Sequence, residues 1–266
     1  MERNPLIVVS SRLDDIRDKG RGIRKSNSSI INTWRRAKEA DVGNTIVDCH
    51  NESLADEVKS VGAYSVTSNH SDIGPTHNYK QPSGLARVAR TVTKFDRFCN
   101  HDLIIHLPEH HVEIDPRFLR ALMYPLAASD VGMATLVSTI LPSLAEDAAK
   151  VAVNWNPDRV VYVMPDAKVG TIVNFSRDTA ELADGHIYAH IPVYIYRRAV
   201  LDRIVRVPPS ERELEHNIEA LRVLDLGFRA EALFVPNVTP TMYVLLTKNT
   251  KRIDAVDIQL SKELKR

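Results

Sequence analysis

The chain has 266 residues, with 44% hydrophobic and 26% charged side chains and a formal net charge of +1. This size and composition are typical of one globular domain, and we expect residues 1–266 to form a single domain. The near-neutral charge argues against nucleic acid or a membrane surface as a partner. Two cysteines exclude a disulfide framework, and no apolar run approaches the ~20 residues of a membrane span, so we expect a cytoplasmic protein.

Short apolar runs alternate with amphipathic segments through the first half of the chain. The predicted strands cover residues 6–9, 45–47, 63–66 and 102–106, and the predicted helices cover residues 28–40, 52–60 and 83–95. Asp115 followed by Pro116 predicts a further helix start, because aspartate caps a helix and proline suits its first turn. The alternation predicts an α/β fold with a doubly wound, mostly parallel sheet.

Predicted strands cluster in the second half of the chain. They cover residues 131–140, 160–164, 171–175, 190–196 and 232–235, and the predicted helices cover residues 197–206, 211–225 and a polar segment from about residue 250. The clustering predicts an antiparallel lobe at roughly residues 155–200. Residues 67–82 are polar and lack periodicity, so we expect a long surface loop there.

The segment that follows the first predicted strand is rich in cations and glycine. It carries Ser10, Arg12, Arg17, Gly20 and Arg21. Loops at this place in α/β folds bind phosphate, because glycine admits a close backbone approach and guanidinium groups match phosphate oxygens. The segment therefore predicts a nucleotide-phosphate site. The alternative is a solvated loop, whose three aspartates neutralise the arginines.

The loop resembles that of the CMP-Kdo synthetases (3-deoxy-manno-octulosonate cytidylyltransferases), in which the first strand leads into P-A-R-Y-x-S-T-R-L-P-G-K-P-L. Arg12, Arg17 and Gly20 match, and Arg21 stands at the family's lysine. Residues 82–87 resemble Q-S-G-T-E-R, which opens a helix near the cytosine in that family. Further ordered matches cover residues 130–136, 175–177, 190–197 and 209–224. The order and spacing of these matches identify the chain as a member of the family.

The resemblance implies the nucleotide-diphospho-sugar transferase architecture and a homodimer built partly through the antiparallel lobe. It implies transfer of CMP from CTP to a 3-deoxy-2-keto sugar acid, with pyrophosphate released and Mg²⁺ as cofactor, in lipopolysaccharide or capsule biosynthesis. The implied catalytic residues are Arg12, Arg17 and Arg21. The implied nucleotide-binding residues are Ser10, Arg12, Arg17, Gly20, Arg21, Ser83, Gly84, Arg87, Pro108 and His110, and the implied sugar-acid residues are Arg177, His190, Tyr194 and Glu213.

The chain also departs from the family pattern at several positions. His110 stands where the Asp of Q-G-D-E-P holds Mg²⁺, and residues 245–250 lack the carboxylate of the second metal motif. Cys49-His50 replaces a T-D pair, Tyr162 stands at the lysine of V-K-V, and Ala220 replaces the Gln of E-Q-L-R. Mg²⁺ prefers oxygen ligands, so these changes predict a weakened magnesium site.

Three alternatives remain for how the negative charge of the triphosphate is neutralised. One of the carboxylates Glu109, Glu113 and Asp115 takes the metal position, or the arginines act without metal. In the third, a transition metal binds to histidines, the candidates being His50, His106, His110 and His111. Two functions stay open in turn: a working nucleotidyltransferase, or an inactive relative that binds a nucleotide or sugar as a regulatory or partner subunit.

Overall fold

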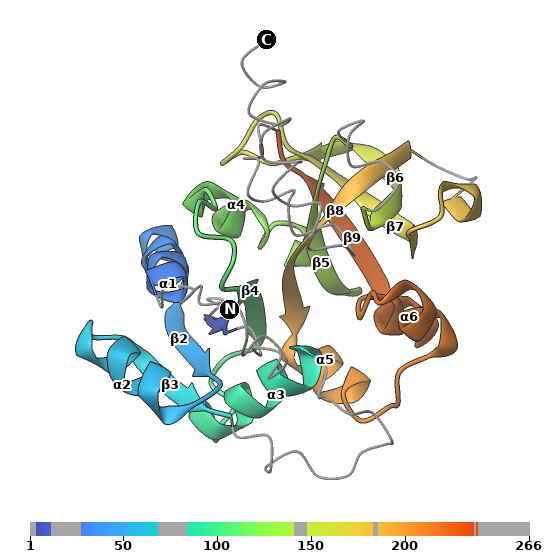
Figure 1. Cartoon of the computed structure of the whole chain (residues 1–266). Coiled ribbons are helices and arrows are strands. Elements are labelled where there is room, and N and C mark those ends of the chain that lie inside the picture. The colour runs from blue at the N-terminus through green and yellow to red at the C-terminus, as the bar shows by residue number, and fades with distance from the viewer. Residues whose placement is uncertain are drawn as a thin grey trace, which may run out of the picture.

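The computed structural model describes residues 4–11, 28–68, 84–140, 148–182, 186–236 and 238. In the first half of the chain its elements are β1 (Pro5–Ser10), α1 (Ser28–Ala40), β2 (Asn44–Cys49), α2 (Glu52–Ser60), β3 (Tyr64–Thr67), α3 (Gly84–Phe95), β4 (Leu103–Pro108), α4 (Pro116–Ala121) and η3 (Pro125–Ala127). The second half contains β5 (Val131–Ser138), β6 (Lys150–Val160), β7 (Lys168–Ser176), η5 (Thr179–Leu182), β8 (His186–Arg197), α5 (Arg198–Ile204), α6 (Glu211–His216), α7 (Leu221–Asp225) and β9 (Arg229–Phe234). Figure 1 shows their arrangement.

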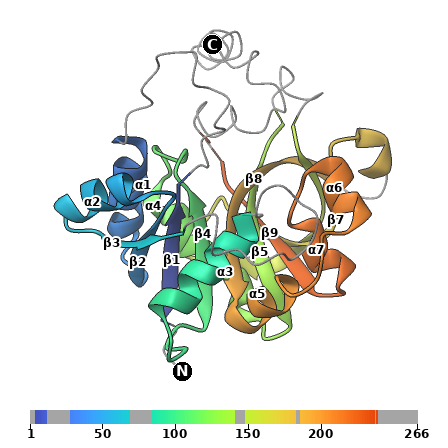
Figure 2. The ribbon, with the colours of Figure 1, turned by 60° about the horizontal axis from the view of Figure 1, so that its bottom comes forward.

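The first four strands form a parallel layer in the order β3-β2-β1-β4. Side chains alternate across β1: Ile7 and Val9 pack into one core with α1, α2 and α4, while Leu6 and Val8 pack into another with α3 and α5. Figures 1 and 2 show these two groups of helices on opposite sides of the sheet. The predicted elements of this half are confirmed within a few residues.

Beyond β4 the sheet is mixed. β8 lies antiparallel between β4 and β5, and β5 in turn pairs with β9 in parallel. The α/β class is therefore confirmed, whereas a mostly parallel sheet is not what the structure contains. Buried parallel and buried antiparallel strands both have continuous apolar runs, so the sequence pattern did not distinguish them.

The strands beyond β4 pair with one another in a closed circuit. β9 pairs with β7, β7 with β6, and β6 with the first residues of β8. Because the rest of β8 pairs with β5, the strands β8, β5, β9, β7 and β6 pair around a closed circuit. We call this circuit of strands the lobe. In sequence its strands lie between Val131 and Phe234, so they extend beyond the predicted range of roughly residues 155–200 at both ends.

Two predicted elements of the second half are wrong. Residues 160–164 are not a strand: β6 ends at Val160 and turns follow it, while the strand itself starts ten residues earlier. Only residues 150–153 of β6 pair with β8, so the rest of the strand is open on that side. Its register with β7 is irregular after Trp155, and it includes Pro157, which an edge or a bulge tolerates. The predicted helix 211–225 is broken into α6 and α7, because Asn217 adopts a left-handed conformation with φ of 52°.

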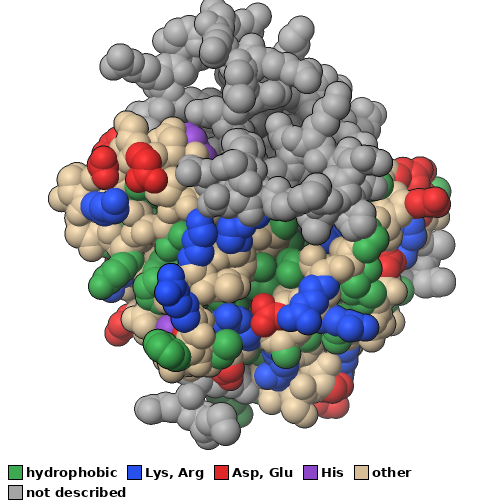
Figure 3. All heavy atoms as spheres, turned by 90° about the horizontal axis from the view of Figure 1, so that it is seen from below, with side chains coloured by type: hydrophobic (Ala, Val, Ile, Leu, Met, Phe, Trp, Pro, Cys, Tyr) green, Lys and Arg blue, Asp and Glu red, His purple; other side chains and the backbone are tan. Residues whose placement is uncertain are grey.

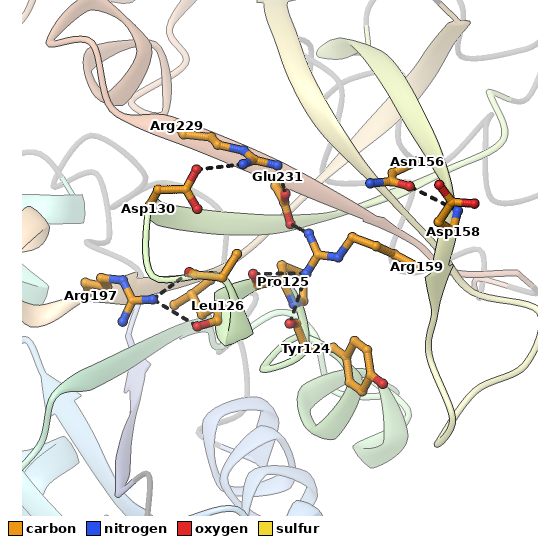
Figure 4. A network of polar contacts seen from close by, with 11 residues as sticks. Tyr124, Pro125, Leu126, Asp130, Asn156, Asp158, Arg159, Arg197, Arg229 and Glu231 are labelled. Atoms are coloured by element: carbon orange, nitrogen blue, oxygen red, sulfur yellow. Dashed lines mark hydrogen bonds and ion pairs between the residues drawn. The ribbon is translucent and has the colours of Figure 1, made fainter. Parts of the chain in front are cut away.

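A buried carboxylate ties the lobe to the loop before β5. Glu231 on β9 is 1% exposed and pairs with Arg159 of β6 and Arg229 of its own strand. Arg159 also donates to the carbonyl oxygens of Tyr124 at 3.3 Å and Pro125 at 3.2 Å, as Figure 4 shows. The irregular end of β6 is therefore fixed by charged hydrogen bonds rather than by sheet pairing.

The surface carries no continuous band of one charge on the face seen in Figure 3. Lys and Arg side chains lie there in separate groups among hydrophobic and neutral ones, with acidic groups beside them. None of the described helices is long and apolar enough to cross a membrane.

The packing of β7 on β6 gives a test of the lobe. A Cβ atom at Gly170 would lie 2.6 Å from the backbone oxygen of Asn154 and 2.8 Å from the ring of Trp155. We expect Gly170→Ala to lower the free energy of unfolding by about 1–3 kcal/mol, as overpacking does. Urea unfolding measures this. In the control Gly132→Ala the nearest atom is a movable methyl of Val200 at 3.0 Å. An equal loss in both variants would contradict the account.

Candidate functional site

The carboxyl ends of β1 and β4 place a hydroxyl beside an imidazole. Ser10 Oγ lies 2.8 Å from His106 Nε2, and both side chains are buried. Parallel pairing sets Ser10 opposite Pro108 at the end of β4. His106 lies two residues before Pro108, so its side chain is on the same face of the sheet as that of Ser10. Three of the residues implied by the sequence comparison, Ser10, Pro108 and His110, thus lie on adjacent strand ends or directly after one.

Arg87 on α3 makes internal contacts at this edge. Its Nη1 donates to the backbone oxygen of Ser11 at 2.7 Å, and its Nη2 donates to Ser11 Oγ at 3.2 Å. Nη2 also forms a buried ion pair with Asp48 on β2, whose other oxygen accepts from Thr91 Oγ1 at 3.1 Å. The family resemblance implied Arg87 as a nucleotide ligand. In this structure both of its terminal nitrogens hydrogen-bond to Ser11, the residue before Arg12.

A row of rings leads from this edge into the lobe. His106 stacks on Tyr194 with ring centroids 6.0 Å apart, and Tyr194 contacts His190 at 5.5 Å. His190 Nε2 lies 3.2 Å from Thr135 Oγ1, and its ring meets Phe175 edge-on. We call His106, Tyr194 and His190 the ring row. It joins the predicted nucleotide side to the predicted sugar-acid side.

Two cations lie at the far end of the ring row. Lys150 is 2% exposed, and the β6 register sets it beside Ser176 and Ala189, the residues next to Arg177 and His190. Its Nζ donates to the backbone oxygen of Arg177 at 2.6 Å. Arg177 Nε in turn donates to the backbone oxygen of His216 at 2.7 Å. Lys150 is a site candidate that the sequence reasoning missed.

Glu213 has a different environment from the other implied sugar-acid residues. Its carboxylate is 5% exposed and forms a two-point ion pair with Arg222 of α7, in which Arg222 Nε donates at 2.7 Å. Arg222 also donates to the carbonyl oxygen of Val207 at 3.2 Å. The pair fastens α6 to α7, so a substrate contact by Glu213 would require this ion pair to open.

The buried imidazoles are held in their neutral form. Burial, together with the positive charges of Arg87 and His110, lowers the pKa of His106 to about 3. Burial and the charge of Arg177 likewise lower the pKa of His190 to about 3. At neutral pH the ring row therefore offers hydrogen bonds and stacking surface rather than positive charge.

The residues after β4 include the histidine that stands at the family's metal aspartate. His110 and His111 have ring centroids 4.5 Å apart, and burial lowers the pKa of His111 well below its usual value. Among the residues that the structure describes, no group of three or more His, Cys, Asp or Glu side chains could hold a metal ion. The candidate metal group of His106, His110 and His111 stays a prediction, as does the Mg²⁺ expected for the family.

Several implied site residues lie outside the described residues. They are Arg12, Arg17, Gly20, Arg21 and Ser83, together with residues 245–250 of the second metal motif. The predicted loop 67–82 lies almost wholly outside them as well, and so does the polar helix from residue 250. The predictions for these segments stay predictions.

Comparison with known proteins now adds to this geometry. Models of protein families give no match to the chain. The chain is 33% identical to the 3-deoxy-manno-octulosonate cytidylyltransferase of Rhodospirillum centenum over 241 residues, which is 89% of this chain and 87% of that protein. It is 32% identical to the enzyme of the same name from Paramagnetospirillum magneticum, over 89% of this chain and 92% of that protein. The chain belongs to the 3-deoxy-manno-octulosonate cytidylyltransferase family.

Solved structures agree with the fold of this family. A CMP:2-keto-3-deoxy-manno-octonic acid synthetase complexed with CTP superposes with a TM-score of 0.66 at 19% identity, covering 99% of this chain and 100% of that one. A UDP-glucose pyrophosphorylase complexed with UDP-glucose superposes with a TM-score of 0.56 at 12% identity, covering 98% of this chain and 100% of that one. The architecture is that of the nucleotide-diphospho-sugar transferases.

The structure offers a second candidate for the lysine of the family's V-K-V motif. The V-K-V lysine was matched to Tyr162, but Tyr162 is 80% exposed in the turn after β6. Lys150-Val151 at the start of β6 has the lysine–valine sequence of the motif and lies beside Arg177 and His190. The signal that could have found it was a lone lysine at the head of an alternating run, Lys150-Val151-Ala152-Val153.

The neutral state of His190 predicts a pH dependence of stability. The unfolded chain binds a proton at this residue below about pH 6.5, whereas the folded chain does so only near pH 3. Stability is therefore complete above pH 6.5 and is lost as the pH falls toward 3. We expect His190→Gln to reduce the slope of unfolding free energy between pH 6 and 5 by about 1.4 kcal/mol per pH unit.

Chemical denaturation across that pH range measures the slope. The control is His186→Gln, because His186 begins the same strand but is exposed. The control should keep the wild-type slope. A wild-type slope in His190→Gln would show that His190 takes up its proton in the folded state.

Proposed function

We propose that this protein is a cytidylyltransferase that transfers CMP from CTP to a 3-deoxy-2-keto sugar acid. The observation that carries the proposal is the ring row, which runs from the Ser10 hydroxyl to His190 and the charge of Arg177 inside a chain of this family. Kdo, named in the homologous enzymes, is the first acid to test. A related acid of the same class remains compatible with the site.

The nucleotide would lie over the carboxyl ends of β1 and β4. Ser10, Pro108 and the start of α3 border this place, and the homologous fold has been solved with CTP. Arg12, Arg17 and Arg21 follow directly in sequence and would supply cations to the triphosphate. Arg87 would act indirectly, because it holds Ser11 at the start of that segment.

The sugar acid would lie at the lobe end of the ring row. Its carboxylate needs a cation, and Arg177 acts electrostatically on His190. Lys150 is a second candidate, because its Nζ donates to the backbone oxygen of Arg177. Neutral His190 and the hydroxyl of Tyr194 would donate or accept hydrogen bonds with sugar hydroxyls. A buried ammonium attracts a carboxylate strongly, because water screens little of the interaction there.

The proposed reaction is a single displacement at phosphorus. A hydroxyl oxygen of the sugar acid forms a bond to the α-phosphorus of CTP, and the bond from that phosphorus to the oxygen bridging to the β-phosphate breaks. Pyrophosphate leaves with the electron pair, and the hydroxyl proton passes to water. The protein's part is to align the two reactants and to neutralise the phosphate charge.

Magnesium would supply further neutralisation in enzymes of this kind. The described residues do not gather its oxygen ligands, so no step is assigned to it here. The loss of both metal carboxylates, at His110 and in residues 245–250, favours the alternative, an inactive relative that binds nucleotide or sugar.

Pyrophosphate release separates the two functions. The protein is mixed with CTP and Kdo in Mg²⁺, Mn²⁺ or Zn²⁺, and also without added metal, and phosphate is counted after pyrophosphatase treatment. We expect pyrophosphate in proportion to a CMP–sugar product in at least one condition. Stabilisation of the fold by CTP without turnover in any of them would support the inactive relative instead.

The role of Lys150 is tested by Lys150→Met, which keeps the length of the side chain and removes its charge. We expect the KM for the sugar acid to rise roughly tenfold or more, which is the scale of one lost charged hydrogen bond. The KM for CTP should stay near the wild-type value. The control is Lys168→Met, an exposed lysine on the adjoining β7. Equal effects of the two variants would remove Lys150 from the site.

A further inference from the structure

The first turn of α3 is held by a carboxylate from a distant part of the chain. Oε1 of Glu219 accepts from the backbone N–H of Gly84 at 2.6 Å, and Oε2 accepts from the N–H of Leu85 at 2.9 Å. The first N–H groups of a helix lack partners inside it and favour negative charge. Glu219 satisfies both of these groups, so the end of α3 is already occupied by a charge of the protein itself.

The break between α6 and α7 is what carries Glu219 to this place. α6 ends at His216, and the left-handed Asn217 redirects the chain before α7 begins. The ion pair of Glu213 with Arg222 fastens the two helices on either side of the break. An unbroken helix over these residues would not have this connection, so the break presents the carboxylate to α3.

Glu219 also lies beside the ring row. A Cβ atom at residue 84 would stand 3.2 Å from Glu219 Oε2 and 3.6 Å from Cε1 of His106. Glycine at this position therefore leaves room for the carboxylate between α3 and His106. The negative charge of Glu219 contributes, after burial, to the raised pKa of Tyr194. One carboxylate thus touches the helix start and faces two rings of the row.

We propose that Glu219 is a positioning residue that sets the start of α3 against the ring row, and so fixes the place of the nucleotide relative to the sugar acid. The inference rests on the proposed function, which puts the nucleotide at the start of α3 and the sugar acid in the lobe. Glu219 needs no contact with either substrate for this role. It acts through the backbone of Gly84 and Leu85.

The test uses Glu219→Gln in the full-length protein. Glutamine keeps one acceptor oxygen but points an N–H₂ group at a backbone N–H, so one of the two hydrogen bonds must be lost. Glu215→Gln is the matched control, because Glu215 is an exposed residue of α6. Gly84→Ala is a second probe, since its methyl would press on the same carboxylate from the other side.

Two readouts are expected to move together. Hydrogen exchange at the amides of Gly84 and Leu85, measured without substrate, should be roughly tenfold faster in Glu219→Gln, the scale of one lost charged hydrogen bond. The KM for CTP should rise by a similar factor, while kcat and the KM for the sugar acid stay within about twofold. Gly84→Ala should change both readouts in the same direction, and Glu215→Gln should change neither.

The inference is overturned by unchanged exchange at the two amides, or by faster exchange with an unchanged response to CTP, which would make Glu219 a helix cap only. If the wild type shows no turnover, the proposed function fails on its own account. The dissociation constant for CTP then replaces KM, and the exchange measurement still decides whether Glu219 holds α3.

Discussion

β8 runs antiparallel between β4 and β5, and its hydrogen bonds set Tyr194 opposite both His106 and Thr135. The two halves of the candidate site depend on this register. Side chains alternate between the faces of a strand, so a shift of β8 by one residue would move Tyr194 to the other face and break the ring row. β8 also belongs to the closed circuit of the lobe, so that strand pairing on both sides opposes such a shift.

Two buried ion pairs fix parts of the candidate site that strand pairing does not hold. Arg87 with Asp48 fixes the residue before the Arg-rich segment, and Glu213 with Arg222 fixes the α6–α7 break. Each pair costs desolvation, so its contribution to stability is small or negative compared with apolar packing. Their value lies in geometry, because charged hydrogen bonds specify both direction and distance. The candidate site is thus shaped in part by charged groups that hydrogen-bond to one another.

Local patterns predicted the first four strands and their helices well, because continuous apolar runs and helix caps depend on neighbouring residues. Local patterns did not predict those features that depend on a contact between residues far apart in the sequence. β6 contains Asn154, Asn156 and Pro157, a pattern typical of a loop. The ion pair of Arg159 with Glu231, which fixes this segment, cannot be recognised from neighbouring residues. The family resemblance implied Arg87 as a nucleotide-binding residue, and its ion pair with Asp48 could not be seen in the sequence because the two lie 39 residues apart. The metal site remains the least predictable part. His110 shows that the family's aspartate is absent, but the sequence does not show which group replaces the charge of that aspartate.

The central claim is that one site spans the ring row, with nucleotide at one end and sugar acid at the other. A crystal structure of the protein with both CTP and Kdo bound tests it most directly. The account predicts the cytidine by Ser10 and the start of α3, and the carboxylate of the acid within hydrogen-bonding distance of Lys150 or Arg177. Ligands bound elsewhere, or an acid whose carboxylate lies away from both cations, would contradict it.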